Sequence, residues 1–312
     1  MDLSESKSLI DAVDARTKLA GANKMEILLF SLGGGETFGI NVFKVREVTK
    51  APAITPSPNM PAGVEGLISL RGSIIPVIEL ARFVDGAPRA EGVSDTMMVT
   101  EYCRHTQGFL VHDVDRIIRV DWDKVRAPDS ALAGNDGLIT ALTELPGGKL
   151  VSILDVEQIL VKAFGEVVVP DLDPIRTEKD CTVLFVDDSM VARREIAQVL
   201  EKLAVKSHVA TNGLEGWVKL QSLAAQAQHD GTPLKQRLNL VLVDAEMPEM
   251  DGYVLTKQIK ADRRFEGIPV VMHSSLSSAA NRAMGNRVGV DAYVAKFDPK
   301  VLAETLRPLL AR

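Results

Sequence analysis

Long hydrophobic runs are missing from this 312-residue sequence. No apolar stretch approaches the roughly 20 residues that a membrane-spanning helix needs, so we expect no direct insertion into a membrane. The opening residues, Met1 to Glu5, also lack the basic head and apolar core of a secretory signal. We therefore expect a cytoplasmic protein.

Cysteine and excess positive charge are also scarce. The two cysteines, Cys103 and Cys181, show no metal-ligand spacing, so we expect buried or free thiols. A formal net charge of -6 argues against a broad nucleic-acid-binding surface. A transcriptional regulator would need a DNA-binding module, and we expect none after the helix-like stretch at 301–306.

The first half lacks the usual marks of an active site: a Gly-rich loop before a helix, histidines at metal spacing, or a Ser-His-Asp arrangement. It contains short apolar runs separated by Gly and Pro, without long helices between them, and this favours small closed barrels. The runs lie at 25–30, 37–42, 66–70, 73–78, 96–100, 107–111 and 149–154. Before them, Leu9, Ile10, Val13 and Thr17 share one face of a predicted amphipathic helix.

Charged residues end three short, β-rich runs of the second half: Asp187 and Asp188 after 183–186, Asp244 after 240–243, and Lys296 after 292–295. Runs of this kind form central parallel strands, whose carboxyl ends meet at the ligand-binding edge of a sheet. Three carboxylates gathered there repel one another unless a hard cation such as Mg2+ lies among them. Asp244 can then accept a phosphoryl group, whose oxygens Lys296 attracts. Ser274, which also ends an apolar run, offers it a hydroxyl.

These runs follow one another on a β-α-β rhythm, and the segment Met247-Pro248-Glu249-Met250-Asp251-Gly252 follows Asp244. In this, residues 181–312 resemble a response-regulator receiver domain. The resemblance implies an α/β doubly wound, flavodoxin-like fold. It also implies the following roles: Asp187, Asp188, Asp244 and the backbone carbonyl of Glu246 hold Mg2+, Asp244 is the phosphoacceptor, Ser274 is the switch hydroxyl, Tyr293 is the aromatic switch, and Lys296 is the lysine of the family.

Two positions depart from the family pattern. Phe297 follows Lys296, where the family usually has proline, often after a cis bond. Glu246, two residues past the phosphoacceptor, places a further acidic side chain near the phosphoryl group. Its charge can lengthen or shorten the lifetime of that group.

The first half carries several motifs in order: Phe38-Gly39-Ile40, Lys44-Val45-Arg46-Glu47-Val48, the stretch 61–72, Ile75-Pro76-Val77-Ile78-Glu79-Leu80, and the closing stretch 152–160. Together they resemble the CheW-like coupling domain of bacterial chemotaxis over residues 24–163. That family folds as two small β-barrels and bridges chemoreceptor tips and the regulatory domain of the histidine kinase. The contact positions implied here are Val45, Glu47, the Gly66 segment and Arg71. From its spacing alone, Arg71 is either a solvated corner or a recognition arginine.

A coupling domain followed by a receiver domain is the arrangement of CheV-type chemotaxis coupling proteins. We therefore expect an amphipathic helix at 1–23, a mostly-β coupling domain at 24–165, an acidic, proline-containing linker at 166–180 and a receiver domain at 181–312. The cytoplasmic chemoreceptor tips and the histidine kinase, which is also the phosphodonor, are the expected partners. The expected location is the receptor array at the membrane.

The expected function is a phosphorylatable scaffold between receptors and kinase. Phosphorylation of Asp244 would tune that coupling or drain phosphate from the kinase, and the only catalysis would be phosphotransfer to this aspartate. The alternative is an aspartate-nucleophile phosphohydrolase. Against it, Asp187-Asp188-Ser189 lacks the Asp-x-Asp-x-Thr spacing of the haloacid-dehalogenase group, and no substrate cap is evident.

Overall fold

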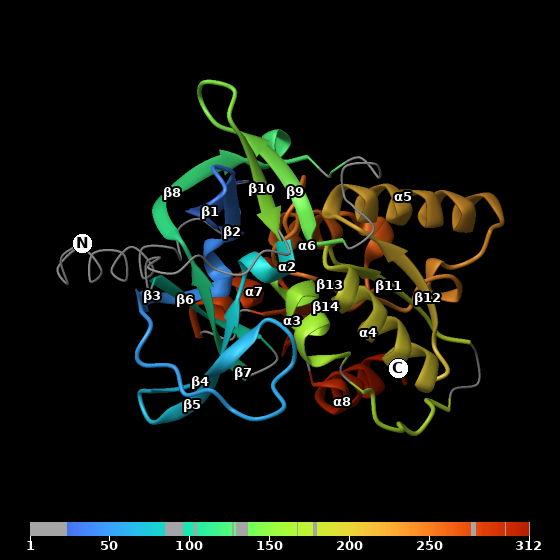
Figure 1. Ribbon diagram of the computed structural model, residues 1–312. Coiled ribbons are helices and arrows are strands. Elements are labelled where there is room, and N and C mark those ends of the chain that lie inside the picture. Colours follow the sequence, from blue (N-terminus) through green and yellow to red (C-terminus); the bar gives the residue numbers. More distant parts are fainter. Residues whose placement is uncertain are drawn as a thin grey trace. The chain divides into compact units, whose positions relative to one another are not determined.

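The computed structural model describes residues 24–84, 96–102, 105–126, 128, 137–166, 168–176, 180–275, 279–296 and 298–311. The amphipathic helix expected at 1–23, Cys103 and Phe297 lie outside these residues. The described chain divides into two compact units (Figure 1). We call them the β unit, Lys24–Glu166, and the α/β unit, which runs from 168 to 311.

The first sheet of the β unit closes into a small barrel. Its strands are β1 (Lys24–Ser31), β2 (Thr37–Asn41), β8 (Asp113–Asp121), β9 (Ile139–Glu144) and β10 (Leu150–Leu154), in the order β8-β1-β2-β10-β9. After β8, the 3-10 helix η3 (Trp122–Lys124) leads to Arg126, which exchanges backbone hydrogen bonds of 2.9 and 2.8 Å with Leu142 of β9. This bridge joins the two ends of the sheet.

The second sheet closes in the same way. It contains β3 (Val45–Lys50), which follows the 3-10 helix η2 (Val42–Lys44), together with β4 (Val64–Leu70), β5 (Ser73–Glu79), β6 (Thr96–Tyr102) and β7 (His105–Val111), in the order β3-β6-β7-β5-β4. Thr55, downstream of β3, exchanges two backbone hydrogen bonds of 2.9 Å with Leu67 of β4. The two barrels expected from the sequence are therefore present.

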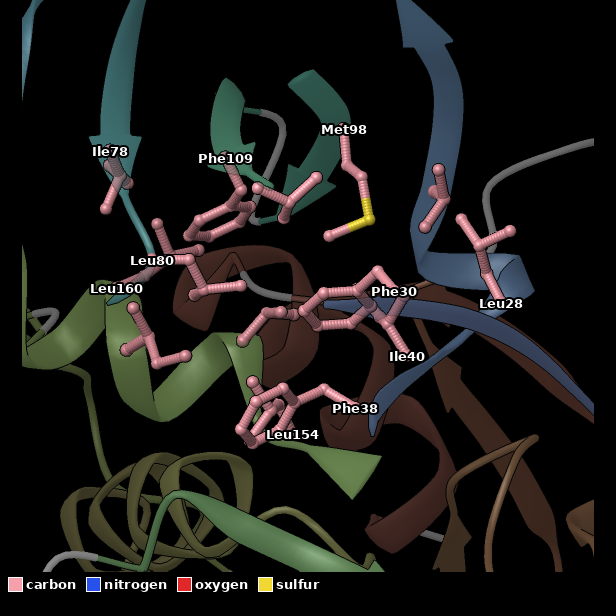
Figure 2. Packing of buried hydrophobic residues seen from close by; sticks show 14 of the residues in the cluster. Leu28, Phe30, Phe38, Ile40, Ile78, Leu80, Met98, Phe109, Leu154 and Leu160 are labelled. Atoms are coloured by element: carbon pink, nitrogen blue, oxygen red, sulfur yellow. The ribbon is translucent and has the colours of Figure 1, made fainter. Parts of the chain in front are cut away.

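Strand alternation lets β1 serve two cores at once. Ile27 and Leu29 point into the first barrel, whereas Leu28 and Phe30 point into a core shared by both sheets. Figure 2 shows this shared core, in which Phe30 lies close to Phe38 with ring centroids 5.9 Å apart. Residues from the second sheet and its flanks also contribute: Ile78, Leu80, Met98 and Phe109. The shared core therefore fixes the two sheets to each other.

Helix α3 (Val156–Phe164) packs Ile159 and Leu160 into the shared core and begins at a buried acidic cap. The Asp155 carboxylate accepts hydrogen bonds from the backbone N–H groups of Glu157 and Gln158 at 3.0 and 3.2 Å. Burial raises the pKa of Asp155 to about 6, and the negative charge of Glu157 adds to this. Short helix α2 (Ala81–Val84) follows β5.

The α/β unit has one parallel sheet covered by helices. Its strands are β11 (Thr182–Val186), β12 (Lys206–Ala210), β13 (Leu240–Val243), β14 (Val270–Ser274) and β15 (Ala292–Ala295), in the order β12-β11-β13-β14-β15. The connecting helices are α4 (Met190–Lys202), α5 (Gly213–His229), α6 (Gly252–Ala261), α7 (Ala279–Val288) and α8 (Pro299–Leu310), with 3-10 turns η4 (Leu234–Gln236) and η5 (Arg263–Phe265). This is the doubly wound fold expected from the sequence. Cys181 is buried, forms no disulfide with another described residue, and donates to the Leu310 carbonyl at 3.7 Å. None of the described helices is long and apolar enough to cross a membrane.

The described part of the linker is docked on the α/β unit. The contacts are the Lys202 ammonium with the Val169 carbonyl at 2.9 Å, the Ile175 N–H with the Leu203 carbonyl at 2.9 Å, and the Arg307 guanidinium with the Pro174 carbonyl at 3.4 Å. Val169 is also buried. These contacts tie the linker to the end of α4 and to α8.

The raised pKa of Asp155 makes the stability of the β unit depend on pH. The folded state holds this proton more tightly than the unfolded state, so the cost of the charge is fully present above pH 6 and disappears as the pH falls toward 4. Asn caps helices as well as Asp but carries no charge. We expect Asp155→Asn to stabilise the β unit at pH 7.5 by about 1–3 kcal/mol and to flatten its pH dependence between 4 and 6.

Urea unfolding followed by hydrogen exchange of β-unit peptides measures this change. Asp155→Ala is the control, because it removes both the charge and the cap and should destabilise. A loss of stability in Asp155→Asn equal to that in Asp155→Ala would contradict the expectation.

Candidate functional site

An acidic cluster lies at the carboxyl ends of β11 and β13. Val186 and Val243 are paired neighbours in these parallel strands, so Asp187 and Asp244, which follow them, emerge side by side. One carboxylate oxygen from each of Asp187, Asp188 and Asp244 lies within 4.8 Å of the other two. The structure thus brings together the three carboxylates that the sequence places at strand ends.

Lys296 bridges two of these carboxylates from the end of β15. Its ammonium lies 2.8 Å from Asp187 Oδ2 and 3.2 Å from Asp244 Oδ2, and all three side chains are buried. One ammonium compensates only part of the charge of three carboxylates, so the cluster stays negative. Several hard oxygen donors with excess negative charge are what a small divalent cation prefers. Asp187, Asp188 and Asp244 could therefore hold such an ion.

Two hydroxyl groups border the cluster at β14 and β15. The pKa of Tyr293 is raised to about 12, chiefly by burial. The negative charges of Glu246 and Asp244 also raise this pKa, whereas hydrogen bonding with Ser274 lowers it. Burial also raises the pKa of Tyr253 on α6, whose hydroxyl interacts with that of Tyr293. The Ser274 and Tyr293 side chains therefore lie close to each other, and Asp244 is near enough for its charge to act on the Tyr293 hydroxyl.

The turn after Asp244 needs glycine because two backbone segments meet there. A Cβ on Gly252 would lie 1.9 Å from the Asp244 carbonyl oxygen, and the Gly252 N–H donates to the Ala245 carbonyl at 3.0 Å. Asp251 caps α6 by accepting from the Val254 N–H at 2.7 Å. The Asp-Gly pair therefore starts α6 directly against the backbone of Asp244, which restrains the position of this residue.

Arg193 also belongs to the site, although the sequence reasoning did not identify it. From the first turn of α4, its Nη1 donates to the backbone carbonyls of Asp187 and Asp188 at 2.8 and 2.7 Å. The Asp187 carboxylate accepts from the Ser189 N–H at 3.0 Å, and Ser189 caps α4 by accepting from the Ala192 N–H. The available signal was an arginine in a first turn without acidic residues, where a cation is unfavourable.

Two of the residues predicted as contact positions in the β unit form an ion pair. Arg71 Nη2 lies 2.5 Å from Glu47 Oε2, with the Arg71 side chain 72% exposed and that of Glu47 16% exposed. Arg71 occupies the turn between β4 and β5 with φ +50°, and Glu47 lies on β3. The pair therefore forms part of the surface of the second barrel. Val45, in contrast, is buried in the shared core.

Gly66 is buried beside the bridge that closes the second barrel. Its φ is +151°, and a Cβ there would lie 2.4 Å from the Thr55 carbonyl oxygen. Thr55 and Leu67 form the closing bridge. Glycine at this position is therefore required by the close approach of two chain segments.

Comparisons with known proteins cover both units. The CheW-like domain family matches residues 26–164, and the response regulator receiver domain family matches residues 183–307. Chemotaxis protein CheV3 of Helicobacter pylori is 33% identical over 278 residues, which cover 88% of each chain. Chemotaxis proteins CheV1 and CheV2 of the same bacterium are 29% and 26% identical, covering 96% and 97% of this chain and 97% and 100% of their own. The similarity therefore spans the two units in one alignment.

The clash at Gly66 predicts a specific stability effect. Gly66→Ala forces the Thr55 segment away and should cost about 1–3 kcal/mol beyond backbone strain. Gly72→Ala is the matched control, because Gly72 also has a positive φ, +85°, but open space around its Cβ position. We expect faster hydrogen exchange at the Thr55 and Leu67 amides in Gly66→Ala than in Gly72→Ala. Equal exchange in the two variants would show that the close approach is not limiting.

Proposed function

The chain belongs to the CheV family of chemotaxis coupling proteins, and from this premise we propose that phosphorylation of its receiver domain adjusts the coupling made by its CheW-like domain. As a CheV protein it couples chemoreceptors to the histidine kinase through the CheW-like domain. The observation that carries the proposal is the cluster of Asp187, Asp188 and Asp244 with Lys296 bound to two of its members.

Asp244 is the proposed phosphoacceptor. A carboxylate oxygen of Asp244 forms a bond to phosphorus while the bond from phosphorus to the donor nitrogen of the kinase histidine breaks, and the imidazole leaves. Asp187, Asp188 and the backbone carbonyl of Glu246 would hold Mg2+ together with Asp244. When bound, Mg2+ would offset the charge of the carboxylates and of the entering phosphoryl oxygens. Lys296, already between two carboxylates, supplies a donor to one of those oxygens.

Ser274 and Tyr293 are the proposed switch. The Ser274 hydroxyl interacts with Tyr293 in the structure and ends a strand beside Asp244. A phosphoryl group on Asp244 offers Ser274 a stronger, charged acceptor. Ser274 would then leave Tyr293, whose position would shift, and the rearrangement would pass to the surface of the α/β unit. Depending on how it acts, phosphorylation tunes the coupling or drains phosphate from the kinase.

The pair of Arg71 and Glu47 is the proposed partner contact of the β unit. Arg71 is the more exposed member and presents a guanidinium that suits an acidic or carbonyl-rich partner surface. Val45 and Gly66, at the other predicted contact positions, are both buried, so we propose no direct partner contact for either. The proposed partners are the regulatory domain of the histidine kinase and the chemoreceptor tips, and the proposed location is the cytoplasmic receptor array.

The assignment of Asp244 predicts its labelling behaviour. With Mg2+ present, we expect the wild type to take label from phosphorylated kinase, and Asp244→Asn to take none above background because it lacks the nucleophilic carboxylate. A chelator should abolish labelling of the wild type. Asp251→Asn is the matched control, since Asn preserves the α6 cap, and it should keep its label. Equal labelling of Asp244→Asn and the wild type would place the phosphoryl group elsewhere.

The exposed guanidinium of Arg71 predicts that coupling and phosphorylation separate. Arg71→Ala should bind receptor–kinase assemblies about tenfold more weakly, which corresponds to about 1.4 kcal/mol. Phosphorylation of Asp244 by free kinase should stay close to wild type. Co-sedimentation beside a phosphotransfer time course measures both. The control is Arg116→Ala, which removes an arginine of similar exposure from the first barrel. Unchanged co-sedimentation of Arg71→Ala would remove Arg71 from the contact surface.

A further inference from the structure

The first turn of α4 carries a positive charge where helices disfavour one. Arg193 lies four residues after the N-cap Ser189, close to the positive end of the helix dipole, and the turn contains no acidic residue to offset it. Its half-buried side chain turns back past the helix start instead of extending into water. An arrangement with this electrostatic cost calls for a compensating interaction.

The compensating interaction is with the backbone of the acidic cluster. Strand β11 ends at Val186, and the next two carbonyl groups, those of Asp187 and Asp188, both accept from Arg193 Nη1. Hydrogen bonds from a charged donor are stronger than those between neutral groups. One nitrogen therefore fastens two consecutive peptide groups, and the side chains of those residues supply two of the three carboxylates in the cluster.

We propose that Arg193 is a positioning residue for the cation site: it holds the Asp187-Asp188 backbone so that both carboxylates converge with that of Asp244. This inference rests on the proposed function. The carboxylates repel one another when no cation is bound. Without the two hydrogen bonds, the loop between β11 and α4 is free to relax that repulsion by moving the carboxylates apart, and binding a cation then requires their reassembly.

Two effects of Arg193 on cation affinity oppose each other. Its guanidinium charge repels a cation at the cluster, whereas its hydrogen bonds keep the oxygen ligands in place. The side chain is only partly buried, and its guanidinium binds backbone carbonyls rather than carboxylate oxygens, so water partly screens the repulsion. Loss of a group that orients metal ligands typically lowers metal affinity about 10–100-fold. Positioning should therefore outweigh repulsion.

The test compares Mg2+ binding by the full-length wild type, Arg193→Ala, Arg193→Lys and Arg194→Ala, with binding followed by calorimetric titration. Arg194, the exposed neighbour in the same helix, is the control for loss of one positive charge. We expect Arg193→Ala to bind Mg2+ about tenfold more weakly. Arg193→Lys, which keeps the charge on a side chain one atom shorter, should be intermediate. Arg194→Ala should match the wild type.

Hydrogen exchange in metal-free protein gives a second measurement that does not depend on the cation. The Ser189 and Ala192 amides donate within the loop and its cap, so they should exchange faster in Arg193→Ala and not in Arg194→Ala. Unchanged exchange in α8 peptides shows that the α/β unit remains folded. If Arg193→Ala unfolds that unit, Mg2+ titration and amide exchange of Arg193→Lys decide whether Arg193 has the positioning role.

The outcomes separate this inference from the proposed function. Equal or tighter Mg2+ binding by folded Arg193→Ala overturns the positioning role. Equal binding would mean that Arg193 has no net effect on Mg2+ affinity, and tighter binding would mean that its charge repulsion exceeds any positioning effect. If the wild type itself does not bind Mg2+, the proposed metal site fails. In that case the role of Arg193 is decided by hydrogen exchange of the Ser189 and Ala192 amides. Unaltered exchange in Arg193→Ala would show that Arg193 does not hold the loop.

Discussion

Mutual repulsion among three gathered carboxylates is the constraint that organises the α/β unit. Lys296 compensates part of that charge by bridging two of the carboxylates. Gly252 and Arg193 instead fix backbone positions: Gly252 lets α6 begin against the Asp244 backbone, and Arg193 binds the backbone carbonyls of the loop that carries Asp187 and Asp188. A buried charge that is only partly compensated is costly. The uncompensated charge lowers the stability of the unit, and a bound cation would offset it at the site where a phosphoryl group would enter.

The β unit depends on a different constraint, which is that a single strand serves two cores. β1 is buried on both faces because its alternate residues enter the first barrel and the shared core. The closing bridges at Thr55 and Arg126 leave each barrel without a free edge at that point. The turn at Arg71 therefore projects from a closed sheet and presents its side chain at the surface.

The sequence was sufficient to predict strands that are buried on both faces, and it was insufficient to predict strands that contain many polar residues. Central strands such as β13 are apolar throughout because both faces are covered, so their charged ends were recognisable. β12 is an edge strand with four exposed residues, and β8 is interrupted by charged residues such as Asp115 and Arg116, so neither has an apolar run to detect. The contacts of Arg193 depend on a side chain folding back in space, and no sequence spacing records that.

The contacts of the linker place the start of the second folded domain before the start of the family match. The match to the receiver family starts at residue 183, yet Lys202 and Arg307 bind carbonyl groups from residues 169 and 174. A fragment cut at the family boundary would lose Thr182, the first residue of β11, together with the backbone acceptors of both side chains and the buried Val169. Dissection at that boundary would therefore yield an altered protein, because the folded module already includes residue 169 whereas the family match begins at residue 183.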